Sequence, residues 1–154
     1  MKNKMSLLVL SVLLTAGPAL ALNITVFDSA DNLAQSLVGS GVTISNVSYT
    51  GAHGASGYFT GGTAAGLGFN SGIVLTTGAA NNLEGNLNTS DAISTSNGFP
   101  GDTYLTSLLG PGYITYDAAI LSFDFVSASD SIYFNYIFGS DEYNVWVNSS
   151  YNDV

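Results

Sequence analysis

The residues of this chain best suited to chemistry are acids near its C-terminal end. Asp141 and Glu142 are adjacent, and Asn152 and Asp153 follow ten residues later. Ca²⁺ takes roughly six to eight oxygen ligands from carboxylates, amide and backbone carbonyls and water, so these four residues are a candidate calcium site. Their spacing is not that of an EF-hand loop, in which acidic positions recur at every second residue. The alternative is a solvated acidic rim in which Asn-Asp forms a turn.

Two further acids, Asp102 and Asp117, are secondary candidates for the same ion. Each is also suited to a turn or to the end of a strand, where a carboxylate accepts hydrogen bonds from backbone N–H groups. We favour this structural interpretation for both residues.

Three aromatic residues close to the first acids, Tyr143, Trp146 and Tyr151, are weak candidates for contact with a carbohydrate. With a pair of catalytic carboxylates they could form the sugar platform of a polysaccharide-acting enzyme. No spacing of acids in this chain is diagnostic of such a pair. Because Tyr and Trp combine an apolar ring with a polar group, they also suit packing in a sandwich core or at its edge, and we favour packing.

Other catalytic chemistries find little support. The only histidine, His53, lies in a Gly- and Ala-rich stretch without a nucleophile-elbow motif, which favours an exposed loop histidine over a serine hydrolase. The chain has no cysteine, so thiolate metal sites, cysteine nucleophiles and disulfides are excluded. We therefore expect no catalytic residue and no cofactor other than Ca²⁺.

Residues 1–21 have the pattern of a secretory signal peptide. Lys2 and Lys4 precede an apolar run, and Ala19-Leu20-Ala21 fits a small-x-small cleavage site. Removing both lysines from a chain of formal charge −9 leaves −11, with no Lys or Arg. Nucleic-acid binding is excluded because no cation can face the phosphates. No later stretch is long and apolar enough for membrane insertion, so we expect a secreted or cell-surface protein.

The acids must be positioned by strands. Leu121 to Phe125 and Ile132 to Phe138 both alternate strongly apolar and weaker faces, and Ser127 to Asp130 between them is rich in turn formers. This pattern predicts an antiparallel β-hairpin with one wet face. A turn at Gly139 would then place the two adjacent acids at the end of the second strand.

Earlier residues predict one helix and several strands. A helix is expected over residues 30–38, capped by Asp28-Ser29 and ended by Gly39. Strands are expected at 23–27, 42–49, 58–59 and 72–78. Residues 79–112 form a long polar stretch with a helical turn near its end, and such loops tend to be functional or mobile. The expected fold is an all-β, antiparallel β-sandwich-like domain with one short N-terminal helix, over residues 22–154.

Three segments occur together: Gly72 to Gly78, Tyr116 to Phe125, and Phe138 to Tyr143 followed by Asn152-Asp153-Val154. Their combination resembles the choice-of-anchor L domain family. The resemblance implies a β-sandwich surface module of a secreted bacterial protein, held at the cell by one of several C-terminal sorting signals, and implies no enzymatic activity. The family domain continues with further strands and a sorting tail, so we expect the C-terminal part and the sorting signal to be missing here.

We therefore expect a secreted, non-catalytic cell-surface or extracellular-matrix module with a structural or adhesive role. The first alternative is a Ca²⁺-dependent glycan-binding module, and the second is a polysaccharide-acting enzyme that uses paired carboxylates. The expected partners are an extracellular polysaccharide or other surface proteins.

Overall fold

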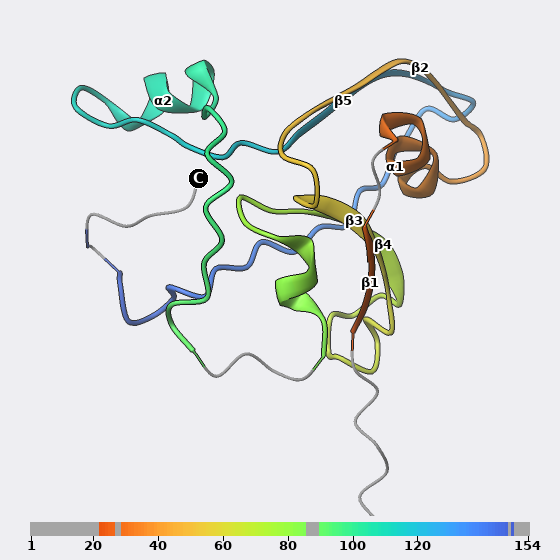
Figure 1. Ribbon diagram of the computed structural model, residues 1–154. Coiled ribbons are helices and arrows are strands. Elements are labelled where there is room, and N and C mark those ends of the chain that lie inside the picture. Colours follow the sequence, from red (N-terminus) through yellow and green to blue (C-terminus); the bar gives the residue numbers. More distant parts are fainter. Residues whose placement is uncertain (1–21, 27–28, 86–89, 148, 150–154) are drawn as a thin grey trace, which may run out of the picture.

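A computed structural model describes residues 22–26, 29–85, 90–147 and 149 (Figure 1). Over these residues the chain forms five strands, two α-helices and one 3₁₀ helix. In chain order they are β1 (Asn23–Val26), α1 (Ala30–Leu37), β2 (Val42–Thr50), β3 (Ser56–Thr60), β4 (Ser71–Leu75), η1 (Ala80–Leu83), α2 (Thr103–Leu109) and β5 (Ile120–Ser127). The fold is all-β and sandwich-like, as predicted, with antiparallel sheets and two small α-helices.

The first sheet has three strands in the order β1-β3-β4, all antiparallel. Its central strand β3 is the most buried, and Phe59 on it is 6% exposed. The Phe59 ring packs on Phe69, with ring centroids 5.8 Å apart and an angle of 51° between the planes. A Cβ atom at Gly57 would lie 2.7 Å from the backbone oxygen of Thr25 on β1, so this strand pair requires a residue without a side chain.

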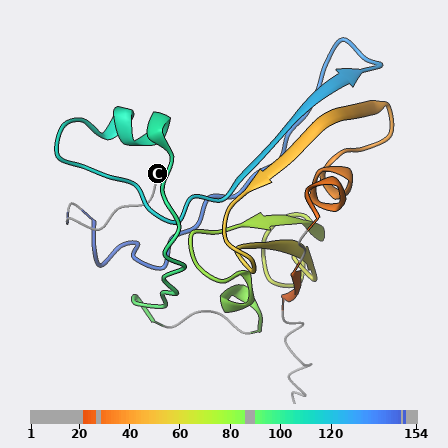
Figure 2. The same cartoon turned by 45° about the horizontal axis from the view of Figure 1, so that its top comes forward.

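The second sheet is a two-stranded antiparallel ribbon of β2 and β5, which projects from the first sheet (Figure 2). The register shifts between Ser45 and Ser48, where Asn46 adopts a positive φ of 51°. Asn tolerates this left-handed conformation better than most residues. Its side-chain Nδ2 donates a 2.6 Å hydrogen bond to the Oδ2 of Asp124 on β5, which ties the irregular point of β2 to its partner.

Helix α1 lies between the two sheets and contacts β2, β3, β4 and β5 (Figure 1). It begins as predicted, because Ser29 is its N-cap and accepts a 3.3 Å hydrogen bond from the backbone N–H of Asn32. Its own residues Leu33 and Ala34 are fully buried. The other buried hydrophobic residues of the described chain are mostly alanines: Leu22, Ala52, Ala55, Phe59 and Ala80. The core is therefore thin, and Leu33 is its main aliphatic side chain.

The predicted hairpin of Leu121 to Phe125 with Ile132 to Phe138 is wrong. The first strand exists as β5, but β5 pairs with β2, and residues 131–140 contain no strand. Instead they run from the outer end of the ribbon back across the three-stranded sheet (Figure 1). An alternating pattern gives a segment two distinct faces, but a strand also needs a neighbouring backbone. The acids after Gly139 are therefore not at a strand end.

Among the residues that the structure describes, no helix is long and apolar enough to cross a membrane.

Candidate functional site

The two adjacent acids, Asp141 and Glu142, lie half-buried at the start of a turn over residues 141–147. The backbone N–H of Glu142 donates to the hydroxyl of Ser140 at 3.2 Å, and its carbonyl accepts a 2.9 Å hydrogen bond from the N–H of Trp146. The indole Nε1 of Trp146 donates to the carbonyl of Asp91 at 3.1 Å. The turn is therefore fastened to a segment about fifty residues earlier in the chain.

Asp141 has the most unusual environment of the predicted site residues. Its Oδ2 atom is buried and has no hydrogen-bond partner among the described residues. Leaving a buried acceptor unsatisfied costs about 1–3 kcal/mol, and more when the group carries charge. A hard cation beside this oxygen would offset that cost, so the donor chemistry of Asp141 fits Ca²⁺.

The rest of the predicted calcium set is not gathered in the described chain. Asn152, Asp153 and the aromatic candidate Tyr151 lie outside the described residues. Within the described ranges, no group of three or more His, Cys, Asp or Glu side chains could hold a metal ion together. A calcium ion at Asp141 would therefore need ligands from Asn152 and Asp153 or from backbone carbonyls.

Asp102 and Asp117 both accept backbone hydrogen bonds. Asp102 is the N-cap of α2, and its Oδ1 accepts a 2.8 Å bond from the N–H of Leu105. Asp117 accepts from two N–H groups, with Oδ1 2.6 Å from the nitrogen of Phe99 and Oδ2 3.1 Å from that of Asn97. These are the structural positions that the sequence favoured for both acids.

The residues around these two acids form a polar clamp that sequence reasoning missed. The hydroxyl of Thr115 donates to the carbonyl of Asp102 at 2.9 Å and lies 2.7 Å from the hydroxyl of Thr106. A Cβ atom at Gly101 would collide with the backbone of Thr115, so the two segments approach as closely as only glycine allows. The side chain of Asn97 donates to the carbonyls of residues 77 and 78, both 3.0 Å away. The clamp thus holds residues 97–102 against 115–118.

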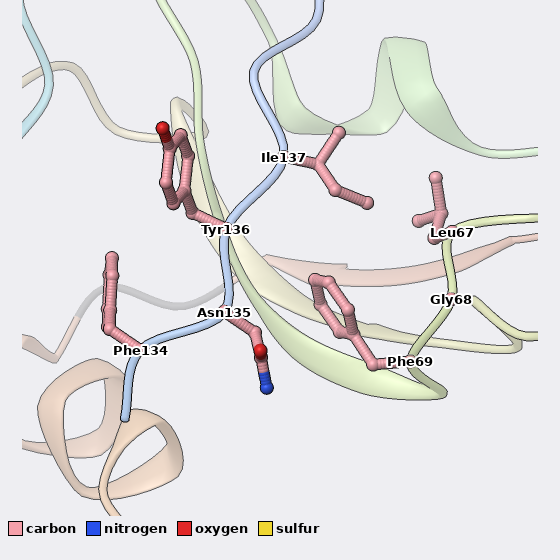
Figure 3. Close-up of a pocket in the computed structure, with 7 residues that line it drawn as sticks. All are labelled: Leu67, Gly68, Phe69, Phe134, Asn135, Tyr136 and Ile137. Carbon is pink, nitrogen blue, oxygen red and sulfur yellow. The ribbon is translucent and has the colours of Figure 1, made fainter. Parts of the chain in front are cut away.

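Two open hollows are lined by residues of the described chain. One, of about 400 Å³, is lined by residues 67–69 and 134–137 (Figure 3). The other, of about 560 Å³, lies beside the clamp and is lined by Ser96, Gly98, Phe99, Pro100, Tyr116 and Asp117. The one acid that lines either of them, Asp117, already accepts two backbone hydrogen bonds. Neither hollow therefore brings together the paired carboxylates of a glycosidase.

The first hollow shows how residues 134–137 are arranged. Phe134 and Tyr136 point to one side of the chain, while Ile137 and Asn135 lie on the side of Phe69 (Figure 3). The rings of Phe134 and Tyr136 are stacked, with centroids 6.2 Å apart and 21° between their planes. The segment therefore keeps the alternating faces of a strand although it belongs to no sheet.

Many large apolar side chains in the second half of the described chain are exposed. Tyr143 is 78% exposed and Trp146 is 39% exposed, so neither is a core residue. The other strongly exposed ones are Tyr104, Leu108, Tyr113, Ile114, Tyr116, Phe125, Val126, Ile132, Tyr133, Phe134, Tyr136, Ile137, Phe138, Val145 and Val147. Large exposed apolar side chains in this number are typical of a protein that contacts a partner.

A family model described as "Choice-of-anchor L domain" matches residues 23–154. Searches of curated proteins and of solved structures found no similar protein.

Proposed function

The chain belongs to the choice-of-anchor L domain family, a family of surface-anchored or extracellular modules, and from this premise we propose that it is a non-catalytic structural and adhesive module. It would act at the cell surface or in the extracellular matrix. The observation that supports this proposal most is the group of exposed apolar side chains between Ile132 and Val147. A secreted protein that presents such a surface has to cover it with a partner or aggregate.

The charge of the chain narrows the choice of partner. Residues 22–154 carry eleven acids and no Lys or Arg. Polyanions are therefore repelled, whereas uncharged polysaccharides and other proteins are not. Aromatic rings such as Tyr133 and Tyr143, which are 92% and 78% exposed, suit the apolar faces of sugar rings as well as protein side chains. An extracellular polysaccharide or another surface protein is the partner that this surface fits.

Adhesion can be measured with residues 22–154 on cellulose and chitin films in a quartz crystal microbalance. We expect measurable adsorption on at least one film, and a loss of about thirtyfold in affinity for the double substitution Tyr133→Ser and Tyr143→Ser, since each ring contributes roughly 1 kcal/mol. Tyr104→Ser on α2 is the matched control, because Tyr104 is also 68% exposed but lies on another element. The absence of adsorption on both films, or an equal loss in the control, would argue against adhesion through this surface.

The second candidate function is a Ca²⁺-dependent glycan-binding module. It is favoured by one observation, the buried and unpartnered Oδ2 of Asp141. Asp141 and Glu142 would hold the ion together with Asn152 and Asp153, and the bound ion would balance their charges and fix the turn over residues 141–147. A polysaccharide-acting enzyme has less support, because Asp102 and Asp117 are occupied by backbone donors and neither hollow is lined by Asp141 or Glu142.

A thermal melt tests the calcium site. With a dissociation constant of roughly 0.1–1 mM, as in extracellular modules, about 10 mM Ca²⁺ should add about 1.4–2.7 kcal/mol to the free energy of unfolding. That corresponds to a Tm rise of several degrees relative to EDTA. Mg²⁺ at matched ionic strength should not reproduce the rise, and Asp141→Ala should remove it.

The control for this melt is Asp130→Ala, which removes one carboxylate from an exposed position outside the turn. It changes the net charge by the same amount as Asp141→Ala and should keep the calcium response. A cooperative melt that does not respond to Ca²⁺ would contradict the calcium site and leave the structural and adhesive module as the remaining proposal. Calcium-independent turnover of a polysaccharide that is lost in Asp141→Ala would instead indicate the enzyme.

A further inference from the structure

We infer that residues 131–138, the aromatic segment, pair with the same segment of a second copy of this chain and so assemble the module through intermolecular β-structure. This inference rests on the proposed function, because it names a partner for part of the same exposed surface. It depends on four properties of the segment: its composition, its exposure, its conformation and its lack of charge.

The composition of the aromatic segment, SIYFNYIF, differs from that of the chain around it. The chain has eleven acids and eighteen glycines, yet this segment has no charge, no glycine and no proline. It consists mainly of isoleucine, phenylalanine and tyrosine, which are strong strand formers. Segments of about six or seven residues with this composition stack on identical copies in cross-β structures. The sequence is thus complementary to itself.

The structure leaves this segment accessible. Its apolar side chains are 50–92% exposed, from Ile132 at the low end to Tyr133 at the high end. Residues 131–140 take part in no strand ladder of the described chain, so their backbone groups are not engaged in a sheet. Because Phe134 and Tyr136 are already stacked on one side of an extended backbone, little ordering is needed to add a neighbouring strand (Figure 3).

The strand nearest in sequence, β5, does not pair with the aromatic segment. β5 precedes it by only a few residues, but in the described chain β5 pairs with β2, from Val42 to Thr50, and not with this segment. A second copy offers an identical segment, on which Asn135 and each ring can stack on their own counterparts.

The acids that flank the segment would make such pairing depend on the salt concentration. Asp130 precedes it, and Asp141 and Glu142 follow it closely. Paired copies bring these like charges together, which opposes assembly at low ionic strength. Salt should therefore promote pairing between copies, whereas it would weaken binding to a cationic partner.

The first test is sedimentation velocity and thioflavin T fluorescence on residues 22–154 over a range of protein concentrations. We expect assemblies that grow with concentration and are favoured in about 0.5 M NaCl over about 0.05 M. Tyr136→Lys should raise the concentration needed for assembly at least tenfold. The control Tyr104→Lys, at a comparably exposed ring on α2, should leave it unchanged. Far-UV circular dichroism of each variant establishes that it remains folded.

The second test introduces single cysteines, which is informative because the chain has none. Strands in a ladder lie about 4.8 Å apart, within the range of Cα separations that a disulfide spans. Parallel, in-register pairing predicts rapid oxidation to dimers for Tyr133→Cys, Asn135→Cys and Ile137→Cys. Antiparallel pairing predicts fast oxidation at no more than one of them. Tyr104→Cys should oxidise slowly and gives the background rate.

Two results would overturn the inference. One is a chain that stays monomeric at high salt and high concentration, and the other is assembly that Tyr136→Lys does not alter. A monomeric chain that still adsorbs to a polysaccharide film would overturn this inference alone and leave the adhesive function standing. A chain that assembles but adsorbs to no film would instead restrict the module to contacts between its own copies.

Discussion

Replacing Leu33 with alanine is expected to lower the free energy of unfolding by roughly 2–5 kcal/mol, a large part of the total stability of a domain this size. Leu33 is 0% exposed and is the largest fully buried apolar side chain of the described chain. It lies on α1, which contacts strands of both sheets. The cavity left by the substitution would therefore loosen the contact between the two sheets as well as the helix itself.

Urea denaturation followed by circular dichroism measures this loss on residues 22–154. Leu108→Ala is the matched control, because it removes the same atoms from an α-helix at a position that is 64% exposed. A change of less than about 0.5–1 kcal/mol is expected there. Equal changes for the two variants would mean that the core does not centre on α1.

Replacing Asp117 with alanine should cost roughly 3 kcal/mol and detach residues 97–99 from the clamp. Its carboxylate accepts hydrogen bonds from the N–H groups of Asn97 and Phe99, and bonds to charged acceptors contribute about 1.5–3 kcal/mol each. Asp117 also has a positive φ of 52°, a conformation that Asp and Asn tolerate better than Ala. Asp117→Asn keeps that backbone preference and one acceptor oxygen, so its loss should be about half as large.

Amide hydrogen exchange provides the specific measurement. In Asp117→Ala the amides of Asn97 and Phe99 should lose protection, while those of β3 keep most of theirs. Asp130→Ala, which removes an exposed carboxylate elsewhere, should leave both amides protected. Unchanged protection in Asp117→Ala would show that the clamp is held by the threonine hydroxyls instead.

Local signals allowed much of the fold to be predicted. Ser29 followed by an amphipathic stretch predicted α1, and the alternation over residues 42–49 predicted β2. Gly72 and Gly78, with the β-branched run between them, predicted β4, although the strand itself is Ser71–Leu75 and residues 76–78 lie outside it. These elements are determined by residues close together in the chain, so their patterns can be seen without knowledge of the tertiary structure.

The pairing of strands could not be predicted in the same way. Asn46 and Asp124 are hydrogen-bonded across 78 residues, and no feature of either segment identifies the other. The alternation of residues 132–138 was as regular as that of β5, but the partner that β5 takes is β2. An alternating pattern of apolar and polar residues predicts which side chains share a face of a strand. It does not predict whether another strand lies beside that segment.

The same distinction between local and long-range features applies to the candidate site. That Asp102 and Asp117 accept backbone hydrogen bonds followed from their residue type and their place beside turns. The burial of the Asp141 Oδ2 atom did not follow, because it depends on how the chain around the turn over residues 141–147 is folded. The sequence identified the acids, and only the tertiary structure distinguished the one with a buried carboxylate oxygen.

The separation of β2 and β5 along the chain also orders the events of folding. All three strands of the first sheet lie between Asn23 and Leu75, so that sheet can close once this part of the chain is free to fold. β2 is made early as well, but its only partner in the described chain ends at Ser127. Residues 51–119 separate β2 from β5, and closing a loop of this length is slow compared with forming local contacts. Until β5 is available, β2 is therefore expected to lack its partner, and in this interval wrong partners or a chaperone have the best access to it.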